Sequence, residues 1–120
     1  MTLQECYTAL GGDYEDVISR LRSERLVRKF VLQFLDDGSY DLLCTSLEQK
    51  NYGEAFRAAH TIKGMCQNLS FTKLQESSGL LSGKLRSGCT PEVESLMEQV
   101  AEDYQRVLGA IRAFQEGLTR

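Results

Sequence analysis

Apolar residues recur at steps of three and four almost throughout this 120-residue chain, and this spacing restricts the fold more than any other feature. No segment shows sustained alternation of apolar and polar residues, and the only proline is Pro91. A period near 3.6 residues is typical of amphipathic helices, whereas a half-buried strand alternates with a period of two. The sequence therefore predicts an all-α protein.

Glycines and capping residues divide the first third of the chain into short helices. A helix that ends at Gly11 is followed by Asp13, a candidate N-cap for the next helix. A third apolar stripe closes at Asp37 and Gly38, whose residue types are typical of a helix end. These features predict short helices within residues 2–36.

Longer helices follow in a bundle core of about residues 39–118. Ser70 is a candidate N-cap for one of them, and Thr90-Pro91 combines an N-cap with proline at the first helical position. The stripe of the last helix repeats every seven residues. Short connectors favour antiparallel neighbours, so we expect an antiparallel up-and-down four-helix bundle within one domain that covers residues 1–120.

Composition argues against several classes of function. The net charge is −3, whereas nucleic-acid binding depends on a basic surface. Apolar runs are too short to span a membrane, and the N-terminus lacks the basic and apolar blocks of a signal peptide. The four cysteines are more than twenty residues apart and His60 is the only histidine, so we expect reduced thiols and no metal site. We therefore expect a cytoplasmic protein that binds neither nucleic acid nor membrane.

The most informative segment is the predicted helix around residue 60. Its core stripe passes through three apolar positions, Ala59, Ile62 and Cys66. A second face of the helix points in a different direction from this stripe. It carries residues at positions i, i+3, i+4 and i+7, namely His60, Lys63, Gly64 and Gln67.

Gly64 and His60 each have two interpretations. A glycine within a helix costs about 1 kcal/mol relative to alanine, so Gly64 indicates either a close helix–helix contact or open access to His60. A lone histidine is most often an ordinary surface or core residue, but a neutral imidazole is also a nucleophile near neutral pH. A phosphorylated His60 would need cationic or hydrogen-bonding groups nearby, which Lys63 and Gln67 can supply.

The run His60-Thr61-Ile62-Lys63-Gly64, followed by Asn68-Leu69, resembles the signature of histidine-containing phosphotransfer (HPt) domains. The family pattern is a histidine preceded by alanine and followed by any residue, an aliphatic residue, lysine and glycine. The similarity continues without a gap into the next helix and extends loosely from about Ser23 to Leu118.

This resemblance implies a four-helix core with the N-terminal helices packed over one end. It implies that His60 accepts a phosphoryl group through Nε2, from an aspartyl phosphate or a histidine kinase, and exchanges it with the aspartate of a response-regulator receiver domain. Lys63 would contact the phosphoryl group, and Gly64 would keep the approach open. The receiver would bring Mg²⁺, so this chain would need no cofactor and no catalytic residue of its own, and would be a carrier rather than an enzyme.

Many members of the family orient the histidine ring with a glutamine on the following helix. The equivalent position here is Ser82, which is too short, so Gln67 or a water molecule would replace that glutamine. We expect a monomer whose receiver docks around Phe56, Arg57 and Phe71. Two alternatives remain: a docking module that is never phosphorylated, and a phosphotransfer domain detached from a chemotaxis-type histidine kinase.

Overall fold

The structure is a computed structural model that describes residues 1–118, and this part of the chain contains α-helices, one 3-10 turn and no strand. The all-α prediction is therefore confirmed. In chain order the elements are α1 (Leu3–Leu10), α2 (Tyr14–Leu21), α3 (Glu24–Gln33), the 3-10 turn (Phe34–Asp36), α4 (Ser39–Glu48), α5 (Tyr52–Leu69), α6 (Thr72–Leu85) and α7 (Glu92–Leu118).

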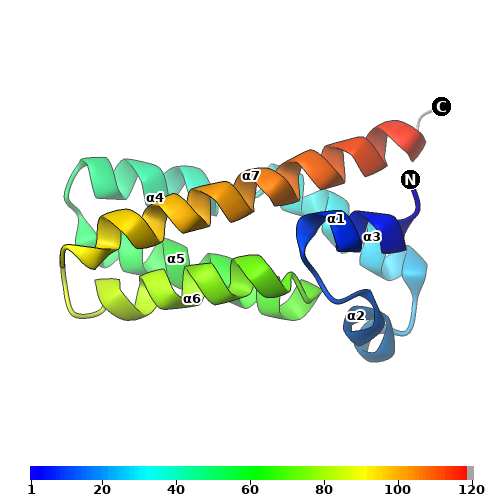
Figure 1. The fold of residues 1–120 in the computed structure, drawn as a ribbon, viewed down its shortest axis with the longest axis horizontal. Helices are drawn as coiled ribbons and strands as arrows, with labels where there is room; N and C mark the ends of the chain where they lie inside the picture. Colours follow the sequence, from blue (N-terminus) through cyan, green and yellow to red (C-terminus); the bar gives the residue numbers. More distant parts are fainter. Residues whose placement is uncertain (119–120) are drawn as a thin grey trace.

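Helices α4 to α7 form an antiparallel bundle in which each helix runs back along the one before it (Figure 1). The inward stripe predicted for α5 is buried, α6 also buries one face, and the buried positions of α7 continue along the helix from Val93 to Phe114. At about 1.5 Å per residue, α7 is about 40 Å long and extends past the bundle into the N-terminal helices. None of the helices in residues 1–118 is both long enough and apolar enough to cross a membrane.

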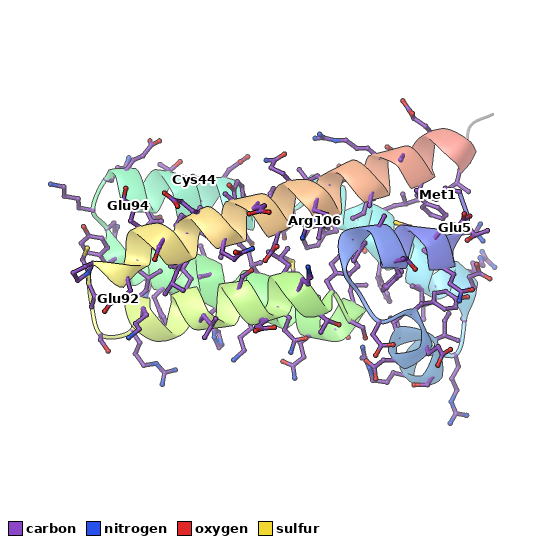
Figure 2. The ribbon with its side chains drawn as sticks, in the orientation of Figure 1. Met1, Glu5, Cys44, Glu92, Glu94 and Arg106 are labelled. Carbon is purple, nitrogen blue, oxygen red and sulfur yellow. The ribbon has the colours of Figure 1, made fainter. Side chains whose placement is uncertain are left out.

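Helices α1 to α3 pack at one end of this bundle. Figure 2 shows Met1 and Glu5 at that end, whereas Glu92 and Glu94, at the start of α7, lie at the opposite end. Helix α1 lies against the second half of α7, where the Cys6 thiol is 3.5 Å from the carbonyl oxygen of Ala110. The long last helix therefore joins the bundle to the N-terminal helices.

The connection between α1 and α2 is hydrogen-bonded to the connection between α5 and α6. The backbone N–H of Asp13 donates to the carbonyl of Ser70 at 2.8 Å, and that of Lys73 donates to the carbonyl of Gly11 at 3.0 Å. Gly11 has a φ of 78°, a left-handed conformation that favours glycine. These bonds hold the end of α5 against the N-terminal helices.

The prediction that Ser70 caps the start of α6 is wrong. Ser70 has a φ of 57° and ends α5 instead, with its backbone N–H directed at the last turn of that helix. Its hydroxyl donates to a carboxylate oxygen of Asp16 at 2.5 Å and accepts from Arg20 at 2.5 Å. Arg20 also donates to the carbonyl of Asn68, so a cation from α2 satisfies the free carbonyls at the end of α5. Asp13 does cap α2 as predicted, because its carboxylate accepts from the N–H of Asp16.

Candidate functional site

Helix α5 carries the residues that the sequence singled out. It begins after Asn51, whose side chain accepts from the N–H of Glu54 at 3.2 Å, as an N-cap does. Its inward face is apolar and buried, formed by Ala55, Ala58, Ala59, Ile62, Cys66 and Leu69. This stripe fixes the rotation of the helix, so the opposite face must point away from the core.

His60 lies on this outward face and is exposed, as its angular offset from Ala59 predicts. Gly64 and Gln67 are also exposed, and Lys63 is half-buried. No hydrogen bond or ion pair reaches His60 from any residue in the described part of the chain. The imidazole nitrogens are therefore accessible to an incoming group.

The space beside Gly64 is open. A Cβ atom at this position would meet no atom within 4 Å, apart from the backbone of its own helix. The alternative that Gly64 serves a close helix–helix contact is therefore wrong. Since Gly64 is one turn from His60, its missing side chain leaves room beside the ring.

The aliphatic stem of Lys63 lies against helix α6. A Cβ atom at Gly79 would be 3.5 Å from the Cδ atom of Lys63 and 3.6 Å from its Cε atom. Gly79 therefore provides a flat surface on which the aliphatic part of the lysine lies.

His60 has an aromatic contact with Phe56, and Phe56 in turn has a cation–π contact with Arg86. The ring of Phe56, one turn before His60, stacks on the imidazole with a centroid distance of 5.8 Å and an angle of 21° between the planes. The guanidinium carbon of Arg86, from α6, is 5.4 Å from the centroid of the Phe56 ring. Arg57 is exposed and forms an ion pair with Glu54 on the same helix.

The prediction that Phe71 belongs to the docking surface is wrong. Phe71 is fully buried between the bundle and the N-terminal helices. Its ring centroid is 5.6 Å from that of Tyr7 and 5.3 Å from that of Phe34. Burying an aromatic ring of this size contributes strongly to a core, which explains why α1 and the 3-10 turn enclose it.

The register of α6 against α5 brings Ser82 to about the same level along the bundle as His60. Two side-chain contacts define how α6 runs against α5, namely Phe56 with Arg86 and Lys63 with Gly79. Ser82 is 4% exposed and its hydroxyl donates to the carbonyl of Gly79 at 3.1 Å, so it does not orient the imidazole. Gln67 is about 10 Å from His60 along the helix axis, because seven residues separate them.

The sequence reasoning missed Gly79 and Arg86. Both lie on α6, and their relevance depends on the register between two helices. An available signal was the antiparallel arrangement itself, in which residues equally far from the α5–α6 connection on each side come together. No group of three or more histidine, cysteine or acidic residues in residues 1–118 is arranged to hold a metal ion.

Comparison with known families identifies the class of protein that this fold and this site define. The sequence model of the Hpt domain matches residues 25–110, which is more than half of the chain. The chain therefore belongs to the Hpt domain family. Domains of this family are histidine phosphotransfer carriers that work with the partner proteins of a phosphorelay. Comparisons with curated proteins and with solved structures gave no significant match.

Proposed function

We propose that this protein carries a phosphoryl group on His60 and exchanges it with the aspartate of a response-regulator receiver domain. The observation that carries this proposal is an exposed, unbonded imidazole next to the open space at Gly64. Because the imidazole is exposed and has open space beside it, a partner's phosphoryl group can approach its lone pair without displacing a side chain.

The transfer would proceed by attack of the Nε2 lone pair of His60 on the phosphorus of an aspartyl phosphate. As the N–P bond forms, the bond between phosphorus and the carboxyl oxygen breaks, and the aspartate leaves as a carboxylate. The proton on Nδ1 stays on the ring until solvent removes it. The reverse sequence returns the phosphoryl group to an aspartate, so one site serves both directions.

Lys63 would stabilise the charge of the phosphoryl group during this exchange. Its ammonium is carried on a stem that lies over Gly79, which limits the conformations that it must lose on binding phosphate. Gln67 lies two turns from His60, so it is better placed to contact a docked receiver than to contact the imidazole ring.

The docking surface would include Arg57, which is exposed and lies about one turn before His60 on α5. Phe56 is only partly exposed and its ring packs on the His60 imidazole, so we assign it to the ring rather than to the receiver. We propose a receiver domain, a histidine kinase or both as partners, with the protein acting as a monomer in the cytoplasm. The free state of all four cysteines supports this compartment. Because α1 packs along α7, the N-terminal helices would belong to the same domain as the bundle.

The test is incubation of the protein with each receiver domain encoded in the same genome, after labelling the receivers with ³²P from a small phosphoryl donor. Label should move to the wild-type protein, survive alkali and disappear in acid, as a phosphoramidate does. His60→Gln should accept none and stay folded at the assay temperature, since the ring is exposed and lies outside the core. Label that persists in His60→Gln, or no label from any receiver, would refute the proposal.

The same assay separates the alternatives. A docking module would bind receivers without taking label, so binding with no transfer would favour that function. A domain that normally works beside a chemotaxis-type kinase would take label from such a kinase but not from any phosphorylated receiver. The accessible His60 favours a carrier over a docking module.

A further inference from the structure

The contact between Phe56 and His60 is nearly parallel. The two ring centroids are 5.8 Å apart and the planes differ by 21°. Residues four apart on a helix lie one above the other, and both side chains lean toward the N-terminus, so the imidazole rests on the phenyl ring. An offset stack of this kind is a favoured arrangement of aromatic rings and is worth about 0.5–1.5 kcal/mol.

Among residues 1–118, the imidazole of His60 has no hydrogen bond, no ion pair and no second ring contact. No hydrogen bond holds either nitrogen, and the hydroxyl of Ser82, on the facing helix, is already committed to the carbonyl of Gly79. An exposed histidine that is held by nothing would sample several rotamers. The stack on Phe56 is the contact that restricts it.

Phe56 is itself held from the neighbouring helix. The guanidinium carbon of Arg86 is 5.4 Å from the centre of the phenyl ring, within the range of a cation–π contact. Phe56 is also partly buried against the core. The phenyl ring therefore packs against both the core and the Arg86 side chain of α6, and it can act as a stable surface for the imidazole.

We infer that Phe56 is a positioning residue for phosphoryl transfer, because it holds the ring of His60 with its edge directed outward. This inference rests on the proposed function. A stack covers a face of the imidazole and leaves the nitrogens on the ring edge free, which is where the N–P bond forms. Phosphoryl transfer needs the nucleophile in line with the bond that breaks, and a misplacement of about 1 Å can cost about 100-fold in rate.

The experiment compares Phe56→Leu with Phe56→Tyr. Leucine keeps an apolar side chain but removes the stack, whereas tyrosine keeps the ring. With a phosphorylated receiver as donor, Phe56→Leu should lower the transfer rate at saturating receiver about tenfold and change KM less than about twofold. Phe56→Tyr should stay within about twofold of wild type in both quantities. Thermal unfolding establishes that both variants are folded at the assay temperature.

A spectroscopic measurement on the free protein separates positioning from docking. The phenyl ring current shifts the carbon-bound protons of the His60 ring, and this shift should fall to that of an unstructured histidine in Phe56→Leu but persist in Phe56→Tyr. Arg86→Gln provides an independent arm, since it keeps Phe56 but removes the cation above it. The His60 signals should move in the same direction in Arg86→Gln, by a smaller amount.

These measurements distinguish a failure of the proposed function from a failure of the positioning role of Phe56. If wild-type protein takes no phosphoryl group on His60, the proposed function is wrong, whatever the spectra show. If wild type transfers normally and Phe56→Leu keeps its saturating rate and its His60 signals, the positioning role is wrong. A rise in KM at an unchanged saturating rate would make Phe56 a docking residue and would also overturn the inference.

Discussion

Lys63 lies over Gly79: a Cβ atom at position 79 would be 3.5 Å from the Cδ atom of the lysine and 3.9 Å from its Cγ atom. These are ordinary van der Waals distances, so a methyl group fits beneath the lysine without moving it. A larger side chain would occupy the space where the stem now lies. The position of the ammonium that we assign to the phosphoryl group thus depends on a small residue on another helix.

Gly79→Leu should therefore slow phosphoryl transfer, because the leucine side chain displaces the stem of Lys63. We expect a loss of about tenfold, since a hydrogen bond to a charged group contributes about 1.5–3 kcal/mol and this one is partly exposed to water. Gly79→Ala is the matched control and should transfer at the wild-type rate. Rates of transfer from a phosphorylated receiver measure both.

A double variant tests whether Gly79 acts through Lys63. Lys63→Ala alone should slow transfer by a similar factor without unfolding the protein, and adding Gly79→Leu should slow it no further. If the two losses multiply, the leucine blocks the partner directly and the positioning argument fails. Unchanged transfer in Lys63→Ala would remove the lysine from the mechanism.

Gly64→Gln should abolish transfer while leaving stability unchanged or higher by up to about 1 kcal/mol, because the helix loses a glycine. Its side chain would enter the open space beside His60, where nothing lies within 4 Å of a Cβ atom. Transfer assays and thermal unfolding on the same preparation check both parts. A variant that melts early but transfers normally would contradict the role of Gly64 in access.

Much of the fold was predictable because helix boundaries and inward faces depend on local patterns. The α5 stripe from Ala55 to Leu69 was visible as a 3.6-residue period, and it alone placed His60 on the outward face. Gly11 and Asp13 marked a helix end and a cap through their own backbone preferences. The resemblance then added the chemistry that periodicity cannot provide.

The errors concern contacts between segments far apart in the chain. Ser70 has the residue type of an N-cap, but its hydrogen-bond partners come from α2. Arg20 is fifty residues away in the chain, so a local sequence pattern could not predict its bond to Ser70. Phe71 comes soon after Asn68-Leu69 of the motif, and this closeness in sequence suggested a place on the docking surface. In the structure, however, the ring of Phe71 packs between Tyr7 and Phe34. The stack of Phe56 on His60 has a spacing that the sequence shows, but the angle between the rings requires coordinates.

Phe71→Ala should destabilise the protein by about 3–5 kcal/mol, as the removal of a fully buried aromatic side chain does. Arg57→Ala is the control, because Arg57 is exposed and its ion pair with Glu54 is worth at most about 1 kcal/mol. Chemical denaturation measures both. Arg57→Ala should instead weaken receiver binding, and a near-wild-type stability for Phe71→Ala would mean that the ring is not part of the core.

The last prediction concerns the dependence of stability on pH at the end of α5. The hydroxyl of Ser70 and the guanidinium of Arg20 both donate to Asp16, and they lower the pKa of its carboxyl group below the ordinary value of 3.8. A carboxylate whose pKa is lower in the folded protein stabilises the fold above its unfolded pKa. That contribution is lost as the pH falls through the folded pKa.

Asp16→Asn should therefore lower the melting temperature at neutral pH, and the difference from wild type should shrink as the pH falls below 3.8. The pKa of Glu5 is also lowered, through hydrogen bonds with Thr2, and the pKa of Glu92 is lowered by the neighbouring Thr90 side chain. Both groups titrate equally in wild type and variant, so they cancel in the difference between the two melting curves. A difference that stays constant from neutral to acid pH would show that Asp16 acts by packing or local geometry rather than through its charge.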